Sequence, residues 1–207
     1  QLREGPAKKK VSAMAMGADG ALWVAVCDTS IGGVYRFDGQ DWTAYVYDET
    51  DGLEDCCVND VAVGPNGNVW AATGNGLASF DGTAWTNHTA DDGLVGNEVD
   101  AVAIDQDGAV WAGTDEGASR FDGGSWKAYI EDDGLLDADI SAIEAAPDGS
   151  VWFATGSGVS CLRDGRWESY TEEEGLPSNR VSSIAPVPDG RIWLGTAFDG
   201  VAVLDPS

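Results

Sequence analysis

The chain has 207 residues, of which 36 are acidic and 11 basic, so its formal net charge at pH 7 is −25. This excess of acid argues against nucleic acid as a partner, because the phosphate backbone is anionic too. No apolar run reaches the ~20 residues of a membrane-spanning helix, which argues against membrane insertion. The chain begins with Gln1 rather than Met, which leaves open whether it is a fragment of a longer protein.

A repeat dominates the sequence. Tryptophans recur at a spacing of 41 residues, and a second tryptophan series follows at the same period: Trp70, Trp111, Trp152 and Trp193, then Trp85, Trp126 and Trp167. A period of about 40–45 residues with strand-turn-strand content is typical of propeller blades. The sequence therefore predicts an all-β fold, a five-bladed β-propeller of four-stranded antiparallel blades.

The first ten residues match only the end of a repeat, since Gly5–Val11 aligns with Gly175–Val181. Residues 1–10 are therefore predicted to be a tail. The propeller follows, with blades at about 11–57, 58–98, 99–139, 140–180 and 181–207.

Four strands, here named a to d, are predicted in each blade. Strand a ends in a tight Asp-Gly or Asn-Gly turn, such as Asp107-Gly108, which tolerates positive φ. Strand b carries the first tryptophan and is apolar on both faces, as expected for a strand buried between neighbouring blades. Strand d reads Trp-x-x-Tyr. In the second blade His88 takes the Tyr position, so the single histidine is predicted to pack rather than to catalyse.

The fifth blade is predicted to lack strand d, because little sequence remains after Val201–Leu204. An apolar strand left at the edge of a sheet is open to pairing with another chain. We therefore expect possible edge-strand pairing through residues 201–204.

Three of the four cysteines lie close to the insertions that lengthen the first repeat. Strand direction alternates within a blade, so the b–c and d–a loops emerge on one face, and these loops contain Cys27, Cys56 and Cys57. No Cys-x-x-Cys zinc spacing is present. A disulfide from Cys27 to Cys56 or Cys57 is expected if the protein is exported, with unconnected thiols as the alternative. Cys161, in a strand c, is predicted to be buried.

The d–a loops also collect acidic residues on that face. They predict a surface for a protein partner or a small cationic or polar ligand, formed by Asp48, Glu49, Asp51, Asp91, Asp92, Glu131, Asp132, Asp133, Glu172, Glu173 and Glu174. A solvated rim of charge is the alternative interpretation. The sequence predicts no cofactor and identifies no metal; the alternative is calcium held by neighbouring carboxylates such as Asp91-Asp92 and Asp132-Asp133.

A second candidate site is the mouth of the central channel. The second residue of every strand a is small and polar, and two acids interrupt the small residues of these strands. The candidates are Ser12, Asn59, Asp60, Asp100, Ser141, Glu144 and Ser182.

The run from Gly175 to Thr196, Gly-Leu-Pro-Ser-Asn-Arg followed by Asp-Gly-Arg-Ile-Trp-Leu-Gly-Thr, resembles the two-component-regulator propeller repeat. That repeat is familiar from sensor ectodomains of bacterial hybrid histidine kinases and is related to the propeller of streptogramin lyases. The resemblance implies a bacterial propeller in an extracellular or periplasmic setting. The histidine chemistry of the lyases does not carry over, because His88 occupies a packing position.

These observations favour a non-catalytic binding or scaffold propeller, such as a sensor ectodomain or an assembly subunit. A lectin-like propeller is the first alternative, and it would need Trp42, Trp85, Trp126 or Trp167 partly exposed for sugar stacking. A lyase-type enzyme is the second. It would need an asymmetric nucleophile and base, and the sequence offers no Ser/His/Asp or Cys/His set.

Overall fold

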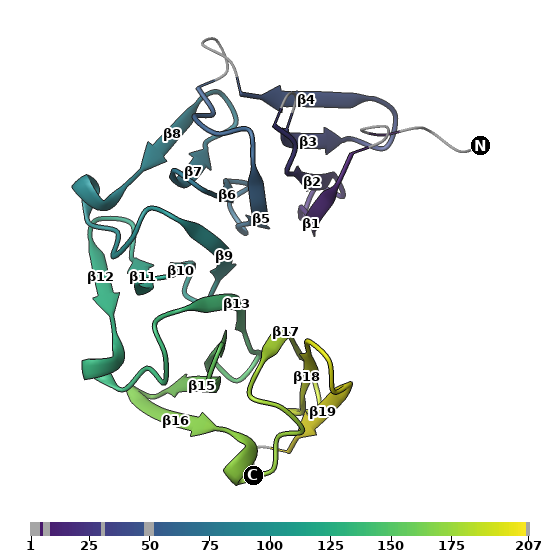
Figure 1. Ribbon diagram of the computed structural model, residues 1–207. Coiled ribbons are helices and arrows are strands. Elements are labelled where there is room, and N and C mark those ends of the chain that lie inside the picture. The colour runs from purple at the N-terminus through teal and green to yellow at the C-terminus, as the bar shows by residue number, and fades with distance from the viewer. Residues whose placement is uncertain (1–4, 6–8, 30–31, 48–51, 206–207) are drawn as a thin grey trace.

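The computed structural model describes residue 5 and residues 9–29, 32–47 and 52–205, and it contains five antiparallel sheets in chain order around one axis (Figure 1). Blade 1 consists of β1 (Val11–Met16), β2 (Leu22–Val26), β3 (Gly33–Phe37) and β4 (Trp42–Val46), and blade 2 of β5 (Val58–Val63), β6 (Val69–Thr73), β7 (Gly76–Phe80) and β8 (Trp85–His88). Blade 3 consists of β9 (Val99–Ile104), β10 (Val110–Thr114), β11 (Gly117–Phe121) and β12 (Trp126–Tyr129), and blade 4 of β13 (Ile140–Ala145), β14 (Val151–Thr155), β15 (Gly158–Arg163) and β16 (Arg166–Tyr170). Blade 5 has three strands, β17 (Val181–Pro186), β18 (Ile192–Thr196) and β19 (Val201–Leu204). The predicted β-propeller with five blades and an incomplete last blade is confirmed.

The turn between strands a and b sets the register of each blade. In blade 3, Asp105 and Ala109 close the turn with a backbone bond of 2.9 Å, and the Asp105 carboxylate accepts from the Asp107 and Ala109 N–H groups. Gly108 has φ of 81°, a left-handed conformation that suits glycine. The strong local preference of this turn explains why the strand boundaries follow from the sequence.

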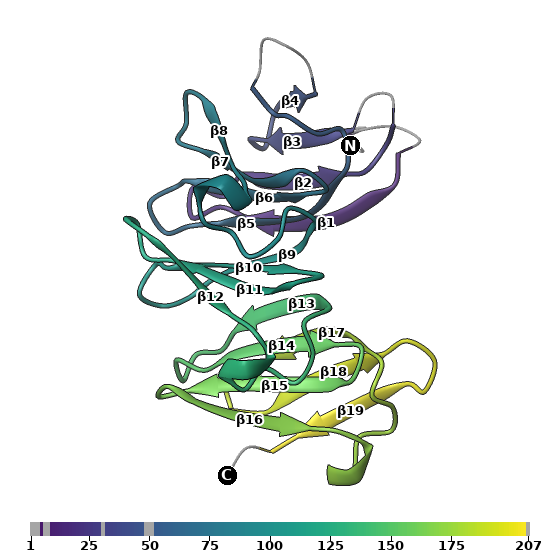
Figure 2. The ribbon, with the colours of Figure 1, turned by 60° about the vertical axis from the view of Figure 1, so that its left-hand side comes forward.

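The blades follow one another along the arc (Figure 2), and the core lies in layers between successive blades. A strand-b tryptophan of one blade packs on strand a of the next, as Trp111 does on Ile140 and Ile143. Trp111 and Trp152 are at most 2% exposed. Because each blade has apolar residues on both faces, its core is completed only by its neighbours.

The five blades form an open arc rather than a closed ring (Figure 1). Blade packing runs between neighbouring inner strands, from β1 to β5, β9, β13 and β17 in turn. At the free face of blade 1, Met14 is 65% exposed, whereas its counterpart Val61 in blade 2 is 4% exposed. Blades 1 and 5 therefore each present an uncovered face.

Among the residues that the structure describes, helical content is confined to short 3₁₀ turns in the d–a loops of blades 2 to 4. Within the described ranges of the chain, no helix has the length and apolar character needed to cross a membrane.

Candidate functional site: the acidic loop face

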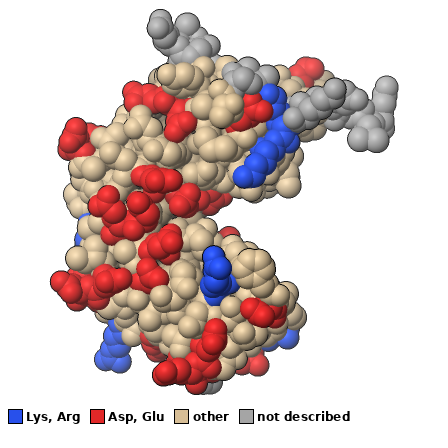
Figure 3. All heavy atoms as spheres, in the orientation of Figure 1, with Lys and Arg blue, Asp and Glu red and all other residues tan. Residues whose placement is uncertain are grey.

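The acidic loop face is the side of the arc that carries the d–a and b–c loops. Three of its d–a loops contain a 3₁₀ turn each: η1 (Ala90–Asp92), η2 (Glu131–Asp133) and η3 (Glu172–Glu174). Figure 3 shows acidic side chains spread along the arc with few basic side chains among them. The predicted residues Asp48, Glu49 and Asp51 lie outside the described residues.

The third residue of each 3₁₀ turn is an acid that caps the turn itself. Asp92 accepts a hydrogen bond from the Thr89 N–H at 2.9 Å, and Glu174 accepts one from the Thr171 N–H at the same distance. Bonds from the backbone and side chain of Thr89 lower the pKa of Asp92, and the equivalent bonds from Thr171 lower that of Glu174. Asp133 holds the Ile130 N–H in the same way at 3.1 Å. These three carboxylates therefore have a structural role.

The preceding acids of the turns are exposed to solvent and are the ones available to a partner. They are Asp91, Glu131, Asp132, Glu172 and Glu173. Glu172 also accepts a hydrogen bond from the Asn179 N–H at 3.2 Å, which fixes the loop that leads into β17.

Most residues predicted for the channel mouth tie one blade to the next. Asn59 donates to the Val99 carbonyl at 2.9 Å, Ser141 donates to the Val181 carbonyl at 3.0 Å, and Ser12 donates to the Val58 carbonyl. Ser182 has no following blade in the structure and donates instead to Gly195 of its own blade, at 3.3 Å. The small polar residue of strand a thus fastens neighbouring blades together near the axis.

Asp60 is another inter-blade tie. Its carboxylate accepts from the Val102 N–H of blade 3 at 2.9 Å and from the Val61 N–H at 2.8 Å. Burial raises its pKa despite these bonds. Part of the Glu144 side chain is exposed to solvent, but nearby protein atoms displace much of the water around its carboxylate. This desolvation raises the pKa of Glu144 to about 7, and the negative charge of Asp60 contributes to the shift.

Asp100, a residue predicted for the channel mouth, is influenced by three further acids that the sequence analysis did not single out. Burial raises the pKa of Asp100, and the negative charges of Glu98, Asp139 and Asp115 raise it further. Asn59 donates to Asp100 at 3.1 Å. The sequence could have predicted this group of acids. Glu98 and Asp139 each directly precede a strand a, and Asp115 lies in a b–c turn, so all three belong to loops of the same face.

A cavity of about 210 Å³ opens between blades 4 and 5 on this face. Its charged lining residues are Asp139 and Arg180, and the hydroxyl-bearing strand-a residues Ser141 and Ser182 line it as well. Arg180 lies 5.5 Å from the centre of the Phe198 ring. The cavity therefore offers one negative and one positive group to a small polar ligand.

The described acids of the face do not form a ready-made metal centre. In the described part of the chain, no group of three or more His, Cys, Asp or Glu residues is arranged to hold a metal ion. Calcium remains a prediction, and one carboxylate of each predicted pair, Asp92 or Asp133, already caps its own turn.

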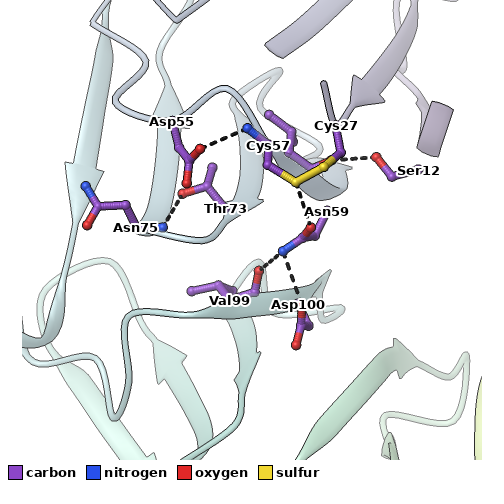
Figure 4. The surroundings of a disulfide bond; sticks show 10 residues. Ser12, Cys27, Asp55, Cys57, Asn59, Thr73, Asn75, Val99 and Asp100 are labelled. Atoms are coloured by element: carbon purple, nitrogen blue, oxygen red, sulfur yellow. Dashed lines mark hydrogen bonds between the residues drawn. A yellow bond between two sulfur atoms is a disulfide. The ribbon is translucent and has the colours of Figure 1, made fainter. Parts of the chain in front are cut away.

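A disulfide joins Cys27, at the end of β2, to Cys57, just before β5 (Figure 4). Of the two partners predicted for Cys27, the structure selects Cys57 and leaves Cys56 as a half-buried free thiol. The bond fastens blade 1 to blade 2. Cys161 is fully buried, and burial raises the pKa of its thiol to about 11, so it is an inert core residue.

His88 occupies the aromatic position of strand d. Its ring stacks on Trp70 at 5.4 Å and contacts Trp126 edge-on at 5.8 Å. Burial lowers its pKa, so the neutral ring is favoured. Its Nε2 lies 3.1 Å from the Ser79 hydroxyl, a bond between adjacent strands.

The strand-d tryptophans pack between blades. Trp85 is 7% exposed, while Trp42, Trp126 and Trp167 are half-buried. The rings of Trp42, Trp126 and Trp167 each lie against a glycine that precedes the blade: a Cβ added to Gly134, for example, would lie 2.7 Å from Trp167.

Known structures share this architecture at low sequence identity. The extracellular domain of a hybrid two component system from B. thetaiotaomicron superposes with a TM-score of 0.78 at 16% identity, covering 96% of this chain and 30% of that one. Virginiamycin B lyase from Staphylococcus aureus gives 0.73 at 13% identity, covering 100% and 73%. PorZ, a surface component of the type-IX secretion system of Porphyromonas gingivalis, gives 0.73 at 19% identity, covering 98% and 34%.

The chain thus spans about a third of the length of the two component structures that it matches. No curated protein gives a significant match. Residues 175–198 match the model of the two component regulator propeller, which agrees with the resemblance seen in the sequence. The chain is a β-propeller array, and its fourth-to-fifth blade junction carries a recognisable two component regulator propeller repeat.

Proposed function

We propose that this protein is a non-catalytic binding propeller that recognises a cationic or polar ligand, or a basic protein segment, through the acidic loop face. The observation that supports it is the unequal pairing of acids on the two faces. On the opposite face, a-b turn acids are paired with strand-c arginines: Arg36 with Asp19, Arg120 with Asp105 and Arg163 with Asp148, at 3.0–3.5 Å. On the acidic loop face, Lys9 with Asp28 at 3.4 Å is the ion pair found among the described residues.

Uncompensated charge on one face produces a field that attracts cations and fades over a Debye length of about 8–10 Å at physiological salt. The cavity with Asp139 and Arg180 supplies a place where a polar ligand can be held in one orientation. The negative charge of the acidic loops would steer a cationic ligand toward this face, and the cavity would select among ligands by shape and polar contacts.

A catalytic role is disfavoured by the surroundings of His88, which is the single histidine of the chain. A solved complex of virginiamycin B lyase uses a histidine-to-alanine variant described as catalytically inactive, so a histidine is required in that enzyme. In this chain the histidine ring is stacked on Trp70, and burial favours its uncharged form. For the lectin-like alternative, Trp85 is unsuited to sugar stacking because it is buried between blades, whereas Trp42, Trp126 and Trp167 are half-buried and meet the condition of partial exposure.

An extracellular or periplasmic location, and a sensor or assembly role, fit the named neighbours, which include extracellular domains of two component systems and a bacterial surface component. The Cys27–Cys57 disulfide fits an oxidising compartment, because cytosolic thiols are kept reduced.

The test is calorimetric titration with a short oligolysine peptide and with spermidine at two salt concentrations. The doubly substituted variant Asp91→Asn/Asp132→Asn should bind more weakly than the parent chain, while Asp107→Asn/Asp122→Asn, in turns on the opposite face, should bind as the parent does. Asp139→Asn should affect spermidine more than oligolysine if the cavity selects small ligands. Equal binding by both double variants would refute the proposed face.

A further inference from the structure

The position directly before strand a changes its charge from blade to blade. Immediately before β1, β5, β9, β13 and β17 it is occupied by Lys10, Cys57, Glu98, Asp139 and Arg180 in turn. Successive inner strands pack against one another along the arc (Figure 1), so each of these residues lies close to its counterpart in the following blade. An acid and a base are therefore neighbours at the junction of blades 4 and 5.

The cavity of about 210 Å³ lies at this same junction, with Asp139 on its blade 4 side and Arg180 on its blade 5 side. Its lining residues belong to strands a and b of the two blades and to the loops beside them, so neither β19 nor its outer edge takes part. Pockets for drug-sized molecules usually measure about 300–1,000 Å³. This cavity therefore suits a smaller molecule.

Neither charged group of the cavity is neutralised by the protein. Among the described residues, no ion pair or side-chain hydrogen bond of Asp139 or Arg180 is found. Their backbone N–H groups are bonded, to Asp137 at 3.1 Å and to Ser178 at 3.4 Å. An arginine without a carboxylate partner is unexpected in a chain with 36 acidic and 11 basic residues. Both charges are thus available to a molecule in the cavity.

Arg180 is held in place without losing its charge. Its carbonyl accepts a hydrogen bond from the Ala197 N–H at 2.9 Å, and its guanidinium lies 5.5 Å from the centre of the Phe198 ring. A cation–π contact of this kind orients the guanidinium plane but leaves its N–H groups able to donate. A guanidinium binds a carboxylate through two parallel hydrogen bonds. Arg180 therefore presents a receptor for a carboxylate.

The blade 4 side of the cavity offers acceptors instead. Asp139 lies close enough to Asp100 for its negative charge to raise the pKa of Asp100. The hydroxyls of Ser141 and Ser182, which also line the cavity, donate to backbone carbonyls at 3.0 Å and 3.3 Å, so their oxygens can still accept. An ammonium group has three donors and no acceptor, and it matches this set.

We propose that the cavity between blades 4 and 5 binds a small zwitterion, an amino acid whose carboxylate pairs with Arg180 and whose ammonium group bonds to Asp139. The two protein groups form no ion pair with each other, so the ligand bridges them. This inference names the ligand class of a cavity on the acidic loop face, and to that extent it rests on the proposed function. A polycation such as spermidine satisfies Asp139 alone and is repelled by Arg180.

The experiment is calorimetric titration of the whole chain with glycine, β-alanine and γ-aminobutyrate, which differ in the length of the carbon chain between their two charges. Acetate and methylammonium are the matched probes, since each carries one of the two charges. We expect at least one amino acid to bind saturably and to raise the Tm. Acetate and methylammonium should bind about tenfold more weakly or worse, because each leaves one protein charge unpaired.

Two variants separate the halves of the cavity. Arg180→Gln and Asp139→Asn should each weaken binding of the amino acid about tenfold or more. Arg180→Gln should leave spermidine binding equal or stronger, whereas Asp139→Asn should weaken it. Arg166→Gln is the matched control, because Arg166 is an exposed arginine of β16 outside the cavity, and this variant should bind as the parent chain does.

The outcomes distinguish this proposal from the proposed function. Absence of binding by all three amino acids, or acetate binding as tightly as they do, would overturn the zwitterion site. Binding of spermidine and oligolysine without any amino acid would overturn it too, while leaving the acidic loop face as proposed. Amino acid binding that needs both Asp139 and Arg180, without binding of oligolysine, would support the cavity site and refute the wider face.

Discussion

Blades 4 and 5 have the same first three strands but differ in what covers them. Trp152 of blade 4 is fully buried between Tyr170 and strand a of blade 5, whereas Trp193 of blade 5 is 40% exposed. The difference shows that a blade does not complete its own core. How much a repeated residue contributes to stability depends on whether a neighbouring strand and a neighbouring blade cover it, and therefore on its position in the array.

The largest contrast is expected between the two tryptophans. Trp152→Ala should lower the free energy of unfolding by about 3–5 kcal/mol, because it leaves a cavity in a closed layer. Trp193→Ala should cost about 1 kcal/mol, since much of the ring is already in water. Urea denaturation followed by circular dichroism measures both. Equal losses of unfolding free energy for the two variants would show that the exposed face of blade 5 is covered in solution.

The second contrast concerns the two terminal blades, because only blade 1 is fastened by the described disulfide. Cross-linking a loop of about 30 residues contributes about 3–4 kcal/mol in the chain-entropy model. Reduction should therefore loosen blade 1 and leave blade 5 unchanged. Limited proteolysis with mass-spectrometric mapping should show new cleavage near residues 9–47.

The control for this experiment is Cys56→Ser, which removes the neighbouring free thiol and should not change the oxidised protein. If reduction opens both ends of the arc equally, blade 1 is not stabilised locally by the bond.

The third contrast lies at the axis, where blade 4 has Glu144 and blade 5 has Ala185 at the equivalent place. The pKa of Glu144 is raised from 4.5 to about 7, so the folded protein binds this proton more strongly than the unfolded chain does. The stabilisation of the folded state by this bound proton is fully present below pH 4.5 and is lost as the pH rises through about 7. Glu144→Gln should flatten this fall in Tm between pH 4.5 and 7, whereas Glu173→Gln in an exposed turn should not.

The smallest contrast is between two ion pairs. Arg163 is half-buried and joins β15 to the a–b turn through Asp148, so Arg163→Gln should cost about 0.5–1 kcal/mol. Arg191 pairs with Asp189 inside one exposed turn, so Arg191→Gln should cost a few tenths of a kcal/mol at about 0.1 M salt. Thermal melts measure the difference, and high salt should reduce it.

The strands were predictable because their ends are marked by local chemistry. Asp-Gly turns such as Asp107-Gly108 set the hairpins, and the tryptophan period sets the blades, so β9 (Val99–Ile104) and β13 (Ile140–Ala145) begin at the predicted starts of blades 3 and 4. The three-stranded sheet of blade 5 agrees with the prediction of an incomplete last blade.

The roles of the polar residues were not predictable in the same way. Asp92 and Asp91 look alike in the sequence, but only the backbone conformation of η1 makes Asp92 the cap. Asn59 and Asp60 were candidates for a channel mouth, and the structure shows that they bond to the backbone of blade 3, which the sequence did not predict. Such partners are about 40 residues away along the chain, so they depend on how blades are placed side by side.

The ties made by Ser12, Asn59 and Ser141 near the axis also govern how the array responds to load. Each tie joins one blade to the next, and blade packing runs between successive inner strands from β1 to β17. Such an array is coupled only through nearest neighbours, as in a one-dimensional lattice. A pulling force on its two ends therefore acts on every junction in series, and the chain extends by releasing one blade at a time while the remaining blades keep their shape.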